Sequence, residues 1–293
     1  MDTFTNTVLT GLLVGGIYAL LALGLILLYK ATKIVNLAYG GVLVLGAYIG
    51  YEIINAGVPG WLGFVLAIVC GAIIGLVLYR FIARPMIGQS PLVIFILTLV
   101  VGVLIDALIG VIWGGQDKSL NLLPLKAVGI FGVLVNVRLI YAFGASLFLF
   151  IILVLLFRYT RVGLAMRCVS EDTNVSQSLG INVKRIFAVA WMVTCAVAVA
   201  SGILYGAAYS VNPGIGSFGL LKGLPVILLG GMESILGALV GGIGLGLLEI
   251  FATQYIEPAI HYEISTTLAM FVMLIILLFR PYGLFGQSRI ERI

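Results

Sequence analysis

The sequence predicts an all-α polytopic membrane protein, and composition and run length are the observations that predict it. Hydrophobic residues make up 62% of the 293-residue chain and charged residues only 9%. The mean hydropathy of +1.24 lies far above the range of water-soluble domains. Several apolar runs also reach the roughly 20 residues that a helix needs to cross a bilayer core of about 30 Å. We therefore expect residues 1–293 to form a single transmembrane domain, with about seven full transmembrane helices plus one short broken segment.

The apolar runs place the membrane-spanning helices along the chain. No Lys or Arg precedes the first run, which therefore lacks the basic region of a secretory signal and is expected to be retained. Charged and turn-forming residues separate the runs that follow. The clear spans are 7–29, 33–54, 61–83, 91–113, 138–158, 185–209 and 263–280.

The apolar region 218–251 is too long for one membrane crossing. A single helix of that length would extend roughly 50 Å at about 1.5 Å per residue. It would also leave Arg280 and the arginines that follow it outside, whereas Lys and Arg collect on the inner side. We therefore expect a short segment 218–232 that reaches the inner side and a return through 234–251, with the N-terminus outside and the C-terminus inside. The interruptions are Gly223, Pro225, Gly230, Gly231, Glu233 and Ser234.

The same sequence argues against catalysis, metal binding and nucleic-acid binding. The net charge of +5 is explained by the inward bias of cationic residues in a polytopic protein, so we expect no nucleic-acid partner. Cys70, Cys168 and Cys195 are too scattered for a metal site or a disulfide framework, and His261 has no companion ligands at useful spacing. The run 114–119 only loosely resembles a P-loop, with the wrong spacing. We expect no metal, no cofactor and no catalytic residue.

Glycine pairs at four-residue spacing recur along the predicted helices. Such pairs let helix backbones approach closely, because lipid provides no hydrophobic drive for helix association. They are compatible with a tightly packed translocation bundle and a subunit interface, and equally with the ordinary use of glycine in transmembrane helices. The pairs are Gly46/Gly50, Gly71/Gly75, Gly110/Gly114, Gly237/Gly241 and Gly242/Gly246.

Two irregular places lie in roughly corresponding halves of the chain, at 30–41 and at 209–219. Paired interruptions of this kind indicate a binding pathway built on an internal repeat. The Asn-Pro-Gly run in the second place is also a strong signal for an external turn, and both interpretations stay open. The expected pathway residues are Asn36, Tyr39, Gly40, Gly41, Pro213, Gly216, Phe218, Gly219 and Gly223.

Residues 158–185 form the longest charged segment, and we call them the platform. Val162, Met166 and Val169 fall at i, i+4 and i+7, which predicts one apolar face of a short helix. A second short helix is expected to end at Gly180, which suits the left-handed conformation after a helix terminus.

The second platform helix has its own start signal. Ser170 is expected to cap it, with Glu171 and Asp172 in the first turn, where the helix dipole favours anions. Val175 and Leu179 are four residues apart and would form its apolar face, towards the bundle. Two capped helices with charged outer faces favour a docking surface for a partner over a plain solvated loop.

Motifs along nearly the whole chain, in order, resemble those of branched-chain amino acid ABC transporter permeases of the LivH type. The most specific match is the platform, which is similar to the cytoplasmic coupling loop of that family. The matching runs are Arg161-Val-Gly-Leu-Ala-Met-Arg167, Glu171-Asp172, Leu179-Gly-Ile-Asn182, Asn36-Leu-Ala-Tyr-Gly40, Leu45-Gly-Ala-Tyr48, Phe218-Gly-Leu-Leu-Lys-Gly223, Leu229-Gly-Gly231 and Gly237-Ala-Leu-Val-Gly-Gly242.

The resemblance implies a multi-pass permease in the inner (plasma) membrane of a prokaryote. It would pair with a second homologous permease subunit, with two ABC ATPase subunits that hydrolyse ATP, with an extracytoplasmic solute-binding protein and with membrane lipid. It would move branched-chain or related hydrophobic amino acids inward by alternating access. The residues that the resemblance places at the ATPase interface are Gly163, Arg167, Glu171, Asp172 and Gly180.

This chain departs from the family pattern at Tyr39, Gly41, Cys168 and Glu233. These departures leave the exact solute open, since importers of urea and short amides share the architecture.

Two other function classes also stay open. One is an ion- or proton-coupled secondary transporter that uses Asp106 and Glu249, because intramembrane carboxylates are functional candidates. We expect both carboxylates towards the outer ends of their helices, where they reach headgroups or water. The other class is a passive channel or structural subunit.

Overall fold

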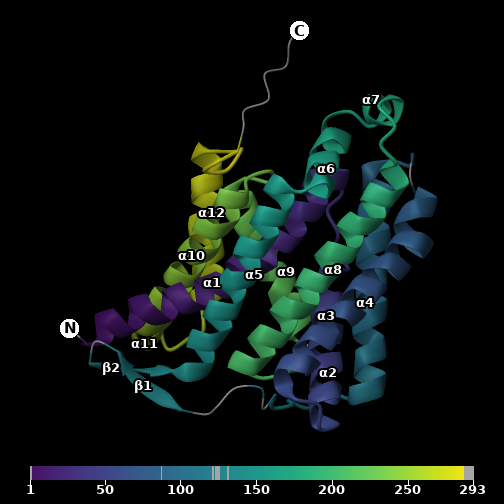
Figure 1. Ribbon diagram of the computed structural model, residues 1–293. Coiled ribbons are helices and arrows are strands. Elements are labelled where there is room, and N and C mark those ends of the chain that lie inside the picture. Colours follow the sequence, from purple (N-terminus) through teal and green to yellow (C-terminus); the bar gives the residue numbers. More distant parts are fainter. Residues whose placement is uncertain (1, 87, 121, 123–125, 131, 287–293) are drawn as a thin grey trace.

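Long helices run side by side between two ends of the molecule in the computed structural model (Figure 1). The structure describes residues 2–86, 88–120, 122, 126–130 and 132–286. The helices are α1 (Asp2–Thr32), α2 (Tyr39–Asn55), α3 (Gly60–Leu78), α4 (Pro91–Trp113), α5 (Val137–Tyr159), α6 (Arg161–Glu171), α7 (Thr173–Ser178), α8 (Val183–Ala208), α9 (Ile215–Gly230), α10 (Ile235–Phe251), α11 (Glu257–Ile260) and α12 (Ser265–Phe279).

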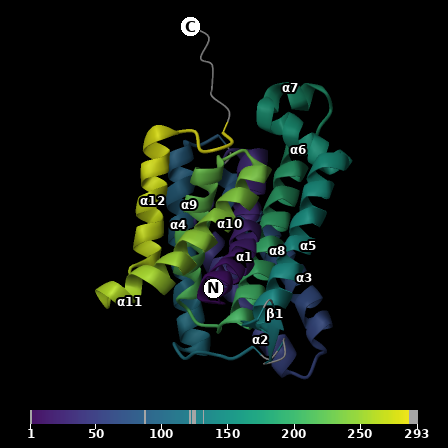
Figure 2. The same ribbon diagram turned by 90° about the vertical axis from the view of Figure 1, so that its left-hand side faces the viewer.

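The two ends of the bundle differ. One end carries α6 and α7 and the last described residues, and we call it the platform end (Figures 1 and 2). The other carries the N-terminus and an antiparallel hairpin of β1 (Ala127–Ile130) and β2 (Val133–Asn136), and we call it the hairpin end. In the hairpin Val128 pairs with Val135, and Gly132 takes a positive φ of 83°. The hairpin is not predicted by the sequence patterns described above.

Membrane-length helices confirm the polytopic class. Within the described residues six helices are long and apolar enough to cross a membrane, and α9 and α12 are shorter apolar helices. The internal repeat stays a prediction. The six long helices are Thr3–Thr32, Gly60–Met86, Leu92–Trp113, Val137–Tyr159, Val183–Ala208 and Ile235–Ile260, of which the second and last include π-helical turns at Tyr79–Ala83 and Ala252–Ile256.

The region 218–251 is split, as predicted, into α9 and α10. Gly231 follows α9 with a φ of 97°, a left-handed conformation that glycine adopts without strain. The Ser234 hydroxyl accepts a hydrogen bond from the Gly237 amide at 3.0 Å and so caps α10. The turn lies at the platform end, since the Leu284 amide donates to the Leu229 carbonyl at 2.7 Å.

The expected start of the second span at residue 33 is wrong, because α2 begins only at Tyr39. Residues 34–38 are not helical, and side chains satisfy part of their backbone. The Leu37 amide donates to the Thr98 hydroxyl at 3.2 Å, and the Ala38 amide donates to Asn36 Oδ1 at 3.0 Å. Non-helical backbone inside a membrane protein requires such partners. The sequence marked 30–41 as irregular, but the apolar composition of 34–38 led to a helix start that was too early.

α1 is the central helix, and its apolar stretch is almost entirely buried. It packs along α10 through glycines of both helices. A Cβ on Gly246 would lie 2.6 Å from Gly15 Cα, and a Cβ on Gly242 would lie 2.5 Å from the Ala19 amide nitrogen. The two backbones are therefore in direct contact, which only residues without a side chain permit. Of the predicted glycine pairs, Gly242/Gly246 thus serves helix packing.

We expect Gly246→Ala to destabilise the protein, because the added methyl group would overlap the α1 backbone. Overpacking of this kind costs about 1–3 kcal/mol. Gly110→Ala is the matched control, since a Cβ at Gly110 in α4 meets no atom within 4 Å and alanine favours a helix over glycine by about 1 kcal/mol. Thermal unfolding in mild detergent should show a lower midpoint for Gly246→Ala only. Equal midpoints would contradict the packing role.

Candidate functional site

The first platform helix is α6, as predicted, and it folds back on the end of α5. The Thr160 hydroxyl accepts a hydrogen bond from the Gly163 amide at 3.1 Å and caps the helix. Met166 and Val169 are buried, whereas Val162 is largely exposed. A Cβ on Gly163 would lie 2.1 Å from the Phe157 carbonyl oxygen, so this position requires glycine for the close approach of the two helices.

The second platform helix differs from the prediction at its start. α7 begins at Thr173 and is capped by Asp172, not by Ser170. Asp172 Oδ1 accepts hydrogen bonds from the Asn174 amide at 2.8 Å and the Val175 amide at 3.0 Å. Glu171 is therefore the last residue of α6 and does not lie in the first turn of α7. A carboxylate of Asp caps a helix as well as a serine hydroxyl does, and the pattern could not choose between them.

The apolar face expected for α7 does not pack on the bundle. Val175 is 55% exposed and Leu179 is 73% exposed, and Ser176 is the buried residue of this helix. Gly180 does take the expected left-handed conformation, with a φ of 82°. The tip of the platform therefore presents two apolar side chains to the surroundings, which suits contact with another protein.

A cleft of about 360 Å³ separates α6 from the turn between α9 and α10. Its walls carry both signs of charge, and the Lys33 ammonium pairs with Glu233 Oε1 at 2.5 Å. The sequence marked Glu233 as an interruption of 218–251 and as a departure from the family pattern, but it did not predict this pairing. The available signal was that Lys33 and Glu233, which have opposite charges, each follow a helix that ends on the same side of the membrane. The charged and hydroxyl residues of the cleft are Lys30, Lys33, Arg167, Ser170, Glu171, Glu233 and Ser234.

Two cations of this cleft share one aromatic ring. The Lys30 ammonium lies 5.2 Å from the centroid of the Phe157 ring, and the Arg167 guanidinium lies 5.8 Å from it. Arg167 also donates to the Arg158 carbonyl at 3.2 Å. Such cation–π contacts hold charged groups at a partly desolvated surface. Of the five predicted interface residues, Arg167 and Glu171 line the cleft.

The two predicted pathway segments meet where α2 and α9 begin. A Cβ on Gly40 would lie 2.5 Å from the Gly216 carbonyl oxygen, and one on Gly216 would lie 3.1 Å from the Gly40 carbonyl oxygen. Gly41 packs in the same way on α4, where its Cβ would lie 3.0 Å from the Gly102 carbonyl oxygen. Backbone therefore lies directly on backbone at this crossing. Farther along α9, Gly219 and Gly223 face Leu43 and Leu21.

Other predicted pathway residues surround this crossing. Tyr39 is fully buried, and its hydroxyl donates to the Leu21 carbonyl at 3.0 Å. Asn36 is also fully buried, and its Nδ2 has no hydrogen-bond partner within the described part of the chain. Pro213 lies in the turn that precedes α9, where the Ile215 amide donates to the Asn212 carbonyl at 3.2 Å. The side chain of Phe218 lies outside the described residues.

The second irregular place contains the turn that the sequence predicted, and its role in a pathway stays a prediction. A turn at 212–214 leads into α9, and the first turn of α9 packs on α2. The turn is tied to the loop after α4 by a two-way backbone pair between Lys118 and Val211, at 2.8 and 2.9 Å.

The two intramembrane carboxylates have different surroundings. Asp106 is half-buried on α4, and its Oδ1 lies 3.3 Å from where a Cβ on Gly216 would stand. The expectation that Glu249 reaches water or headgroups is wrong. Glu249 is only 8% exposed, and it forms an ion pair with Lys222 of α9 inside the bundle. Sequence patterns missed this pairing because the residues are separated by 27 positions on two helices.

Among the described residues, no group of three or more His, Cys, Asp or Glu side chains is placed to hold a metal ion. The three cysteines are free thiols, with Cys195 buried.

Known proteins resemble this chain over nearly its whole length. The permease LivH of the high-affinity branched-chain amino acid transport system of Escherichia coli (strain K12) is 29% identical, over 99% of this chain and 98% of that protein. The permease BraD of Pseudomonas aeruginosa is 28% identical with the same coverage. A probable LivH of Methanocaldococcus jannaschii is 27% identical over 97% of this chain and 94% of that protein.

A solved structure, PsaBC from Streptococcus pneumoniae in complex with Fab, aligns with 94% of this chain and 91% of that chain, at 17% identity and a TM-score of 0.47. Likeness at this level supports no conclusion about function. A family model, described as the permease component of the branched-chain amino acid transport system, matches residues 7–280. Given this match over most of its length, the chain belongs to the family of branched-chain amino acid transport permeases.

Proposed function

We propose that this chain is the membrane permease subunit of an ABC importer that moves branched-chain or related hydrophobic amino acids inward by alternating access. ATP hydrolysis would take place on separate ATPase subunits. The observation that carries the proposal is the platform. It is a structured pair of helices with two exposed apolar residues at its tip and a mixed-charge cleft beside it, and a self-contained carrier has no need of such a surface.

The distribution of cations supports placing the platform end on the cytoplasmic side. Lysines and arginines concentrate there, at the ends of α1 and α5, on α6 and at the start of α8. The hairpin end carries Lys118, Lys126 and Arg138. Because cationic residues collect inside, the N-terminus would face outwards in the plasma (inner) membrane of a prokaryote. The arginines after Arg280 fall in 287–293, outside the described residues.

Docking of an ATPase on the platform would use two kinds of contact. Val175 and Leu179 at the tip would enter an apolar groove of the partner, while Arg167 and Glu171 would meet its charged groups in the cleft. Gly163, Asp172 and Gly180 would act indirectly, by shaping the two platform helices. Gly163 permits the close approach of α6 to the end of α5, Asp172 caps α7, and Gly180 ends it.

The cleft also offers a route from the docking surface to the pathway. The Lys33–Glu233 pair joins the start of the non-helical linker 34–38 to the turn between α9 and α10. The linker leads into α2 and the turn follows α9, and these two helices cross at Gly40 and Gly216. A movement of the platform end, driven by the ATPase, would therefore be transmitted to both α2 and α9. The crossing between these helices would then open and close for the solute.

Further partners follow from the family. A second homologous permease would complete the membrane unit, a solute-binding protein would deliver the amino acid at the hairpin end, and lipid would cover the exposed apolar faces of α3 and α4. The relatives named above are permeases of branched-chain amino acid transport systems, which favours leucine, isoleucine and valine over urea or short amides.

The experiment that tests the proposal is co-purification of the permease with its partners, followed by reconstitution in liposomes. We expect an ATPase and a second permease to accompany it. Leucine, isoleucine or valine should stimulate ATP hydrolysis in the presence of the binding protein, and a protonophore should have no effect at constant ATP. Stimulation by urea or acetamide alone would shift the assignment to the short-amide importers. Uptake without ATPase partners would overturn it.

We expect Glu171→Lys to uncouple transport, since it reverses a charge at the docking cleft without touching the membrane-embedded core. Uptake should fall at least tenfold while insertion and gel-filtration behaviour stay unchanged. Glu263→Lys, the same reversal at an exposed residue after α11, is the matched control and should transport normally. Retained uptake in Glu171→Lys would count against docking at this cleft.

We also expect Gly40→Ala to impair transport, because the methyl group would press on the Gly216 carbonyl and keep α2 and α9 from closing. Amino-acid uptake should fall several-fold at unchanged amounts of protein in the membrane, with Gly110→Ala as the control that adds the same atom in open space. Uptake is the measurement. Equal uptake rates for Gly40→Ala and Gly110→Ala would contradict a role of the crossing in the pathway.

A further inference from the structure

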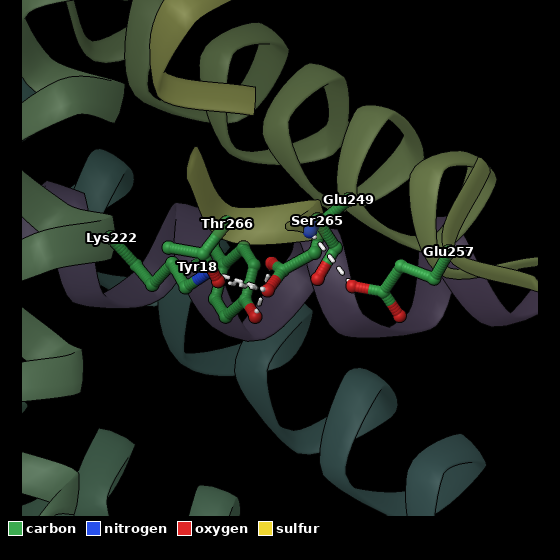
Figure 3. Close-up of polar contacts among 6 residues, drawn as sticks. All are labelled: Tyr18, Lys222, Glu249, Glu257, Ser265 and Thr266. Atoms are coloured by element: carbon green, nitrogen blue, oxygen red, sulfur yellow. Dashed lines mark hydrogen bonds and ion pairs between the residues drawn. The ribbon is translucent and has the colours of Figure 1, made fainter. Parts of the chain in front are cut away.

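A buried ion pair and its hydrogen-bond partners connect four helices inside the bundle (Figure 3). The Lys222 ammonium on α9 contacts Glu249 Oε1 on α10 and donates to the Thr266 hydroxyl on α12 at 2.7 Å. The Tyr18 hydroxyl on α1 donates to Glu249 Oε2 at 2.9 Å. Lys222 and Tyr18 lie midway along α9 and α1, whereas Glu249 lies near the end of α10 and Thr266 at the start of α12.

Both charges of this pair are well satisfied. Each oxygen of the Glu249 carboxylate has a partner. Oε2 accepts from Tyr18, and Oε1 accepts from Lys222 and from Thr266, the latter at 3.2 Å. The Lys222 ammonium further lies 5.9 Å from the centroid of the Tyr18 ring. Lys222 is 1% exposed, so removal of either charge would leave the other uncompensated in a medium of low dielectric constant. Ionisable residues at such depth are rare and are retained mainly where they serve a function.

Lys222 lies outside the row of α9 glycines that faces the pathway crossing. In that row Gly216 packs on Gly40, and Gly219 and Gly223 pack on leucines of α1 and α2. Contacts between glycine and apolar side chains resist little when helices slide or separate. The contacts of Lys222 are directional and charged, and they connect α9 to α1, α10 and α12. α9 is therefore held more specifically at Lys222 than at the crossing.

The pair also fixes the start of α12, which lies at the edge of the bundle (Figure 2). Among its apolar residues only Ala269 and Met273 are buried. Its first two residues are both tied by hydrogen bonds. The Ser265 amide donates to Glu257 Oε1 at 2.8 Å, and Thr266 belongs to the ion-pair network (Figure 3).

We propose that Lys222 and Glu249 are positioning residues of the transport cycle. They hold α9 to α1, α10 and α12, so that these four helices move as one unit when α9 separates from α2. This inference rests on the proposed function, in which the α2–α9 crossing opens for the solute. A pair with a purely structural role would be replaceable by apolar residues of similar volume without loss of coupling.

The test is reconstitution of the whole importer with Lys222→Met, with Glu249→Met and with both substitutions together. Each single variant should assemble poorly, because it leaves one buried charge. The double variant should assemble at normal yield. In that variant we expect the amount of leucine moved per ATP hydrolysed to fall at least tenfold while basal ATP hydrolysis persists. A ratio equal to that of the unmodified complex would overturn the proposal, since the pair would then be replaceable packing.

Thr266→Val is the second variant, and it keeps the proposal testable if the double variant does not assemble. It removes one hydroxyl of the network without removing a charge. We expect a lowered transport-to-ATP ratio at normal yield. Thr194→Val is the matched control, because its buried hydroxyl donates to the Gly24 carbonyl at 3.1 Å away from the network. If the two threonine variants have the same ratio as the unmodified complex, the pair does not position α9.

The unmodified complex, run in the same assay, separates this inference from the proposed function. If leucine, isoleucine and valine fail to stimulate its ATP hydrolysis, the proposed function fails, whatever the variants do. If they stimulate it and the variants match it, only the positioning role of the ion pair fails.

Discussion

A bilayer offers no water to backbone or charged groups, and the architecture of this protein depends on that constraint. At the non-helical linker before α2 and at the buried Lys222, the chain supplies hydrogen-bond or ion-pair partners itself. The linker before α2 is held by the side chains of Asn36 and Thr98. The Lys222 ammonium contacts Glu249 and Thr266 and lies over the ring of Tyr18. These self-satisfied places are also where the functional proposals converge, because irregular backbone and buried charge persist only where something is gained from them.

The bundle combines two kinds of helix contact with different mechanical properties. Glycine crossings, such as those of α1 with α10 and of α2 with α9, bring backbones together without directional bonds. Hydrogen-bonded and charged contacts, such as Lys222 with Glu249 and Lys33 with Glu233, fix one helix relative to another. A transporter that alternates between two states needs surfaces that separate and units that stay intact. The crossing of α2 and α9 fits the first role, and the group formed by α1, α9, α10 and α12 fits the second.

Local patterns predicted much of the platform. They failed at the start of α7, where two residues with similar ability to cap a helix were available. The helix over 161–171 and the left-handed Gly180 followed from periodicity and turn chemistry. The cap of α7 went to Asp172 instead of Ser170, which moved Glu171 into the preceding helix. Val175 and Leu179 have the spacing of a buried face, yet they are exposed. Spacing shows that two side chains share a face of a helix, but it does not show what that face meets.

The sequence by itself determined the membrane class, the approximate spans, the split of 218–251 and the resemblance to a permease family, because these depend on composition, run length and local motifs. Only the tertiary structure decided which residues are partners. Lys222 with Glu249 and Lys33 with Glu233 are separated by 27 and 200 positions, and no periodicity of one helix specifies a neighbour on another. The sequence marked 30–41 as irregular, but the start of α2 was placed too early because the apolar residues of 34–38 resemble a helix. The non-helical linker is stabilised by Thr98 of α4, whose hydroxyl accepts the hydrogen bond of the Leu37 amide.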